Sequence, residues 1–129
     1  MPTSEQIRSA ADAYAAAVSS ADKPRILAQF APGAAVVDPY PSPAHVGHEA
    51  IGGFWDIVLS MGTPQSFTIE QIAVAGDAAC FLFRLIVSVG GAGQLFAVSG
   101  FDVITVGDDG LISSLTAYWD PGQMAEVTA

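Results

Sequence analysis

Residues 94–106, QLFAVSGFDVITV, predict a long β-strand that is apolar on both of its faces. Because side chains alternate along a strand, Asp102 shares its face with apolar residues, here Phe96, Val98, Ile104 and Val106. Burying an unpaired carboxylate is costly, so a protonated acid that donates a hydrogen bond is the cheaper state there. The alternative is a carboxylate at a strand end or bulge that reaches solvent or Arg84.

The segments on either side of this strand extend it into an antiparallel meander. Alternating and β-branched patterns predict further strands at Ser66–Ala75, Ala78–Val87 and Leu111–Trp119. The pair Gly76-Asp77 is typical of a two-residue hairpin turn, and glycines mark the later turns near residues 90–93 and 107–110.

The N-terminal third predicts helices instead. Apolar residues recur at spacings of three and four, namely Ile7, Ala10, Ala11, Tyr14 and Val18, and Thr3 with Gln6 forms a capping-box pattern. A second helix is indicated by Asp22 as cap and Pro24 in the first turn, continuing through Phe30 and ended by Pro32 and Gly33.

The middle of the chain predicts one short strand and one more helix. Ala34–Asp38 reads as a strand stopped by Pro39, and prolines make the next residues a loop. A third helix is expected over His48–Leu59. Helices followed by a meander predict an α+β domain, with the helices packed on one face of a curved sheet.

Composition limits the possible functions. The 129 residues fit one domain, 1–129, and 51% hydrophobic against 13% charged residues excludes disorder and predicts an apolar interior or cavity. Four basic against thirteen acidic residues make nucleic acid and anionic lipid surfaces poor partners, so we expect neither nucleic-acid binding nor membrane insertion. Glycines interrupt the longest uncharged segment, 85–101, so no membrane span is expected. With a single cysteine, Cys80, and no signal-peptide pattern, we expect a cytoplasmic protein.

Several other polar residues have two readings each. Tyr14 lies on an apolar helix face, where a core tyrosine bonded to a backbone carbonyl is an ordinary finding. Asp38 precedes a proline, as turn-forming carboxylates often do. His45 and His48 have no acidic ligand at a matching spacing, so we expect no metal site. Arg84 could be an interface anchor, an outward residue at a bulge or a cavity residue.

Taken in chain order, Tyr14, Asp38 and Asp102 resemble the catalytic set of the steroid Δ5-3-ketosteroid isomerase family. The resemblance covers nearly the whole chain and includes Val37-Asp38-Pro39, Gly47, Ala50-Ile51, Phe54, Ala73-Val74-Ala75 and Ala117-Tyr118-Trp119. It implies a cone-shaped antiparallel sheet with three N-terminal helices enclosing an apolar cavity, as in nuclear transport factor 2 and SnoaL-type polyketide cyclases.

The resemblance also implies roles, following the mechanism established for ketosteroid isomerases. Ionised Asp38 would move a proton within a steroid-like ketone so that its double bond becomes conjugated. Tyr14 and protonated Asp102 would donate hydrogen bonds to the ketone oxygen. The substrate would be a hydrophobic small molecule, no metal or organic cofactor would be needed, and the protein would be a homodimer through its outer sheet face.

Four residues are expected to contact substrate or support the site: Trp119, Phe54, Phe30 and Leu82. Trp119 would also steady Asp38 through its indole N–H. Trp55 departs from the pattern, because the family commonly has a tyrosine there that supports the catalytic tyrosine.

Two alternatives stay open at this stage. An epoxide hydrolase or cyclase on the same fold would place Arg84 in the cavity between Asp38 and Asp102. A non-catalytic steroid- or lipid-binding protein would bind its ligand without turnover.

Overall fold

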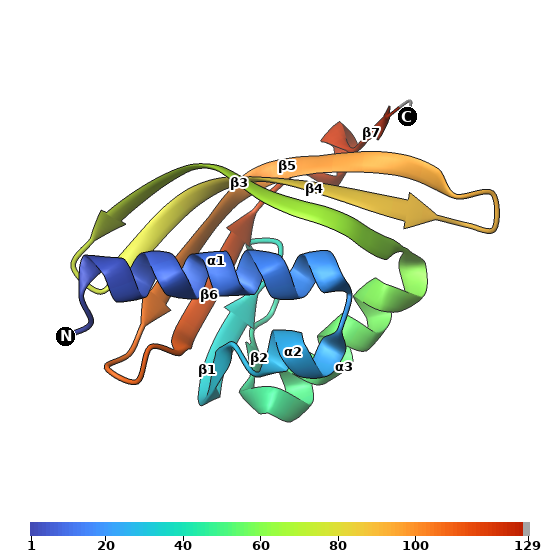
Figure 1. Cartoon of the computed structure of the whole chain (residues 1–129). Helices are drawn as coiled ribbons and strands as arrows, with labels where there is room; N and C mark the ends of the chain where they lie inside the picture. Colours follow the sequence, from blue (N-terminus) through green and yellow to red (C-terminus); the bar gives the residue numbers. More distant parts are fainter. Residues whose placement is uncertain (128–129) are drawn as a thin grey trace.

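A computed structural model describes residues 1–127. Its three helices are α1 (Ser4–Ser20), α2 (Lys23–Leu27) and α3 (Gly47–Met61). α1 and α3 pack against one curved, unclosed sheet, α2 packs against these two helices, and α1 lies beneath the arch of the long strands (Figure 1). The predicted α+β class is therefore confirmed, whereas the expected domain end at residue 129 lies outside the described residues.

The sheet is built mainly from the predicted meander. Its strands are β1 (Phe30–Val37), β2 (His45–Val46), β3 (Thr63–Ala75), β4 (Ala78–Val89), β5 (Gln94–Val106), β6 (Ile112–Tyr118) and β7 (Ala125–Val127). They are ordered β2-β1-β6-β5-β4-β3, and β7 pairs with β5. Neighbours from β3 to β6 are antiparallel.

One pairing differs from the predicted antiparallel sheet, because β1 runs parallel to β6. Parallel neighbours need a long connection, and α3 together with β3, β4 and β5 supplies it. The alternation within a strand shows which faces are buried but does not encode the direction of a neighbour that lies far away in the chain.

Helix starts were predicted better than helix ends. Thr3 and Gln6 form the expected capping box, with hydrogen bonds of 2.8 and 3.1 Å, and Asp22 caps α2. The second helix nevertheless stops at Leu27, and Phe30 opens β1 instead of closing the helix. The apolar pattern there fits both structures, and pairing of Phe30 with Ile112 of β6 favours the strand.

The short strands β2 and β7 were not predicted. Two or three residues are too few for an alternation pattern, so both depend on pairing with longer neighbours, β1 and β5 respectively.

The core lies between the helices and the concave face of the sheet. Phe81 and Phe83 of β4 point into it, whereas Leu82 and Arg84, which alternate with them, point to the opposite face. No helix among residues 1–127 is long and apolar enough to cross a membrane.

Candidate active site

An apolar cavity of about 350 Å³ opens between α3 and the strands β4 and β5. Its walls are almost entirely hydrocarbon or aromatic and include Phe54, Trp55, Val58, Phe83, Leu85 and Val98. Asp38 is its only acidic lining residue, and the Trp119 indole lines it beside that carboxylate. Such a cavity favours a hydrophobic ligand that is handled at one polar end.

Asp38 stands where β1 ends, at the edge of this cavity. The Trp119 indole N–H donates a hydrogen bond of 2.7 Å to Asp38 Oδ1. Burial raises the pKa of Asp38 to about 6, against the lowering effects of the Trp119 hydrogen bond and the nearby His45 charge. Asp38 is therefore a stronger base than an ordinary carboxylate, yet it is mostly ionised at neutral pH.

Gly100 allows Trp119 to reach this position. A Cβ atom on Gly100 would lie 2.5 Å from the Tyr118 carbonyl oxygen and 2.7 Å from Trp119 Cβ. Both contacts are too short for carbon, and one is with backbone, so a side chain at position 100 would force β6 and the indole away. The gap that Gly100 leaves in the apolar face of β5 is thus filled by the residue that holds Asp38.

Asp102 lies in the interior of β5. At 2% exposure, it is the one buried polar or charged residue among residues 1–127. Its strand partners Phe81 and Ala117 are buried as well. Burial, and then the negative charge of Asp38, raises the pKa of Asp102 well above its usual range. Arg84 is exposed and faces the other side of the sheet, so the alternative of a carboxylate paired with Arg84 is wrong.

Tyr14 projects from α1 into the same buried region and is 3% exposed. Its ring packs edge-on against Phe30 and Phe67, with centroids 5.8 and 5.6 Å apart. Burial raises the pKa of its phenol, and the charges of Asp102 and Asp38 raise it further. The phenol therefore stays protonated and is able to donate a hydrogen bond.

Neither the Tyr14 hydroxyl nor the Asp102 carboxyl pairs with another protein group within residues 1–127. Buried polar atoms are normally hydrogen-bonded, and no fully enclosed side-chain nitrogen or oxygen in this part of the chain lacks a partner. Both groups therefore keep a small accessible area, although neither Tyr14 nor Asp102 is among the residues that line the apolar cavity. The three groups interact electrostatically, because the charges of Asp102 and Asp38 raise the pKa of Tyr14 and the charge of Asp38 raises the pKa of Asp102.

The residues expected to contact substrate fall into two groups. Trp119 and Phe54 line the cavity, as does Trp55. Phe30 is buried behind the Tyr14 ring and supports that side chain instead. Leu82 belongs to the outer face of the sheet, because strand alternation turns it away from Phe81 and Phe83.

The cavity residues that were not anticipated include two methionines at its opening. Met61 at the end of α3 and Met124 beside β7 line the cavity but remain 64% and 42% exposed, so they flank its opening. A lone methionine near the end of an element carries no signal in the sequence. Met124 reaches the site only because β7 folds back onto β5.

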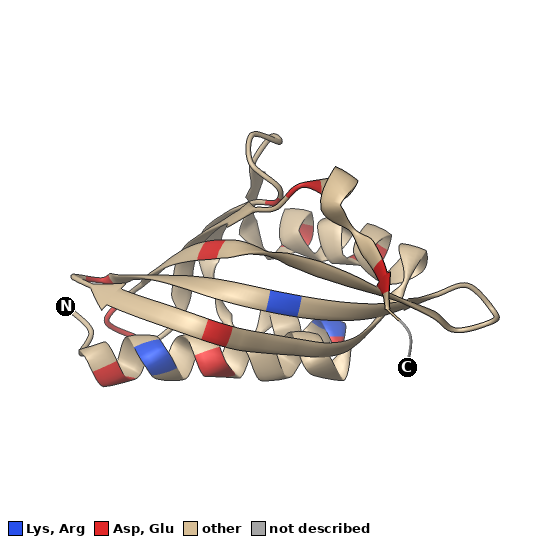
Figure 2. Cartoon of the chain, turned by 90° about the horizontal axis from the view of Figure 1, so that it is seen from above, with Lys and Arg blue, Asp and Glu red and all other residues tan. Residues whose placement is uncertain are grey.

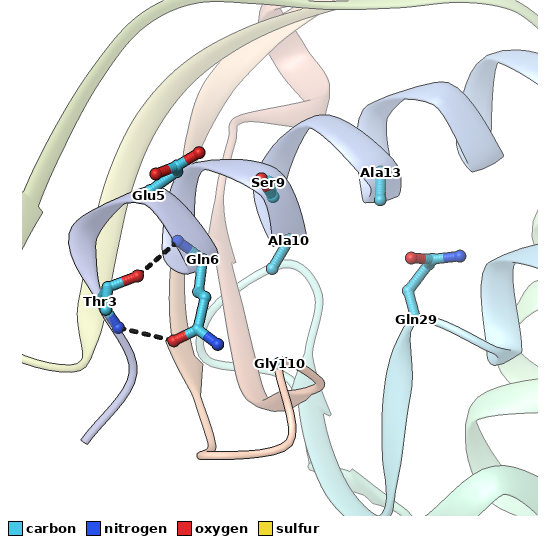
Figure 3. Close-up of a pocket in the computed structure, with 8 residues that line it drawn as sticks. All are labelled: Thr3, Glu5, Gln6, Ser9, Ala10, Ala13, Gln29 and Gly110. Atoms are coloured by element: carbon cyan, nitrogen blue, oxygen red, sulfur yellow. Dashed lines mark hydrogen bonds between the residues drawn. The ribbon is translucent and has the colours of Figure 1, made fainter.

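A second hollow, of about 540 Å³, lies on the surface beside the start of α1 (Figure 3). It is lined mainly by short or polar side chains such as Ser9 and Gln29, with the Thr3–Gln6 capping box at its rim. This hollow is not lined by Tyr14, Asp38 or Asp102. No cluster of three metal-binding side chains occurs within residues 1–127.

Comparison with known proteins bears on this geometry. The profile of the SnoaL-like domain matches residues 11–115. A steroid Delta-isomerase of Nocardioides simplex is 33% identical over 126 residues, covering 98% of this chain and 99% of that protein.

Solved structures extend the likeness of the fold. A Δ5-3-ketosteroid isomerase from a Mycobacterium species superposes with a TM-score of 0.81 at 22% identity, covering 95% of this chain and 98% of the other. The epoxide hydrolase/cyclase-like enzyme SalBIII, linked to pyran ring formation in salinomycin, superposes with a TM-score of 0.86 at 14% identity, covering 98% and 100%.

Proposed function

Because the chain belongs to the SnoaL-like domain family, we propose that it is a steroid Δ5-3-ketosteroid isomerase-like enzyme, which moves a double bond into conjugation with a ketone. The observation that carries this proposal is the Asp38 carboxylate on the wall of an apolar cavity, with a second carboxyl group, Asp102, and the Tyr14 phenol buried in the same fold. Burial raises the pKa of Asp38 to about 6 and that of Asp102 well above its usual range, which favours an ionised Asp38 and a protonated Asp102. The resemblance to a steroid Delta-isomerase over almost the full chain supports it.

In the proposed reaction Asp38 is the proton carrier. Its carboxylate removes a proton from the carbon between the ketone and the double bond, which leaves a dienolate. It then returns the proton two carbons further along, so that the double bond becomes conjugated. Oδ1 is fixed by the Trp119 indole, whereas Oδ2 has no hydrogen-bond partner among residues 1–127 and is available for the proton.

Tyr14 and Asp102 stabilise the charge that develops on the ketone oxygen. Each is a protonated donor with no competing partner in the described chain, and both residues are almost fully buried, at 3% and 2% exposure. Hydrogen bonds to a developing oxyanion are strongest in such a low-dielectric site. The apolar walls then receive the rest of a flat hydrophobic ketone.

The likeness to SalBIII fits the epoxide hydrolase alternative. The residues that this alternative requires are nevertheless not brought together. Epoxide hydrolysis would require Arg84 to lie in the cavity between Asp38 and Asp102, around a water molecule. Arg84 is exposed on the outer face, so this arrangement is absent from the described residues. A binding protein without turnover is distinguished from the isomerase by the assay below.

The test is conversion of 5-androstene-3,17-dione, followed by the absorbance of the conjugated enone that forms. Because Asp38 must be ionised, kcat/KM should fall as the pH drops through about 6 and should level off above it. A protein that binds the conjugated product, seen as quenching of tryptophan fluorescence, but never raises the absorbance would be a binding protein instead.

We also propose a homodimer that forms through the outer face of the sheet. Phe101 and Tyr118 are partners across β5 and β6 and are 48% and 45% exposed, and the Tyr40 ring lies 5.3 Å from that of Tyr118. Charged positions are sparse on the long strands (Figure 2). Exposed apolar patches of this kind typically mark association surfaces.

Phe101→Arg is therefore expected to convert the dimer into a monomer in sedimentation experiments, because it places two charges in a symmetric apolar contact. Ile57→Arg, on an exposed position of α3 away from this face, is the matched control and should leave the dimer intact. A wild-type protein that sediments as a monomer at high concentration would contradict the proposal.

A further inference from the structure

His45 lies near Asp38 in the fold, although residues 39–44 separate the two in the sequence. Val36 of β1 and His45 of β2 are directly opposite each other in an antiparallel pair. Opposite residues of such a pair point to the same face, and Asp38 follows directly after the end of β1, two positions along from Val36. Diagonal neighbours of this type have Cα atoms roughly 7–8 Å apart, within reach of an aromatic side chain.

The His45 ring also contacts the cavity wall. It lies against the Phe54 ring, with centroids 4.9 Å apart and planes tilted by 40°. Phe54 lines the cavity together with Asp38. The next residue, Val46, is 62% exposed, which agrees with an inward direction for His45. The imidazole therefore stands at the rim of the cavity, on the side of the carboxylate.

The other ionisable groups near β2 are otherwise engaged or exposed. β1 and α3 are the elements that pack most extensively against β2. Of the groups on α3, His48 Nε2 lies 2.9 Å from the Phe30 carbonyl oxygen, Asp56 pairs with Lys23 at 2.7 Å, and Glu49 is exposed. β1 itself carries no ionisable side chain and leads directly into Asp38. Asp38 in turn interacts with Asp102 and Tyr14, both buried behind it.

We propose that His45 is a positioning residue for Asp38. The His45 ring holds Phe54 in the cavity wall, and the positive charge of His45 stabilises the Asp38 carboxylate. This inference rests on the proposed role of Asp38 as the base. A positive charge at this distance favours the ionised carboxylate and offsets part of the effect of burial. The positive charge of His45 lowers the pKa of Asp38, so the carboxylate keeps its charge to a lower pH than burial alone would allow.

The first test compares pH profiles of kcat/KM for His45→Phe and His45→Gln with the wild type. Both variants remove the charge, and phenylalanine keeps a ring against Phe54. We expect the acid midpoint to rise by about half a pH unit in both variants, so that the activity at pH 5 relative to the activity at pH 8 falls about threefold. His48→Gln removes an imidazole but keeps a donor for the Phe30 carbonyl, and it should leave the midpoint unchanged.

The second test does not need turnover. Titration of the Asp38 carboxyl carbon by NMR should show a higher midpoint in His45→Phe and His45→Gln than in the wild type. If the protein turns over no steroid but this midpoint still rises, the inference about His45 holds and only the proposed reaction fails. An unchanged Asp38 midpoint in both variants, or a loss of activity equal at pH 5 and pH 8, would overturn the inference.

Discussion

Asp38→Asn is expected to lower kcat/KM for isomerisation by about 10²–10⁴-fold, the usual contribution of a positioned general base. The amide has nearly the shape of the carboxylate, and its oxygen can still accept the Trp119 hydrogen bond. It cannot accept the proton of the substrate, so both halves of the transfer are lost together. The measurement is the rate of enone formation from 5-androstene-3,17-dione at pH 8, where wild-type Asp38 is fully ionised.

Asp12→Asn is the matched control for this substitution. Asp12 is exposed on α1, far from the cavity lining, so the same chemical change there should leave the rate unaltered. Binding of the product enone, measured by tryptophan fluorescence, should be retained by Asp38→Asn, because the apolar walls are unchanged. Turnover within threefold of the wild type would exclude Asp38 as the proton carrier.

Much of the fold was predictable because its strongest signals are local. Capping residues such as Thr3 and Asp22, the Gly76-Asp77 turn and the alternation in β5 each depend on neighbours in the chain. The features that were missed depend on distant partners. The parallel pairing of β1 with β6 and the two short strands exist only once the sheet has assembled.

The candidate site shows the same division. Asp102 stood out because a charge in a two-faced apolar strand is costly, and the structure indeed buries it. Tyr14 and Asp38 were ordinary residues by pattern alone and were singled out by resemblance. Leu82 was placed on the wrong face, because β4 is apolar on both sides at that point and the pattern does not identify the inner one.

Tyr14→Phe is expected to lower kcat by about 10²–10³-fold, the cost of removing one donor to a developing oxyanion. The ring keeps its edge-on contacts with Phe30 and Phe67, so binding and folding should change little. The matched control is Tyr118→Phe, because Tyr118 is partly exposed on the outer face of the sheet. A loss of only a few fold in Tyr14→Phe would mean that its hydroxyl does not meet the reacting oxygen.

Asp102 provides the sharper test, since its role depends on its proton. Asp102→Leu removes the donor and should cost about as much as Tyr14→Phe, whereas the amide of Asp102→Asn still donates a hydrogen bond and should cost much less. Burial raises the pKa of Asp102, so the wild type should lose activity as the pH rises through that pKa and the carboxylic acid becomes an anion. Asp102→Asn cannot ionise, and its rate should therefore stay level over the same alkaline range. An ionised Asp102 would repel the dienolate, and in that case both substitutions would raise the rate at neutral pH instead of lowering it.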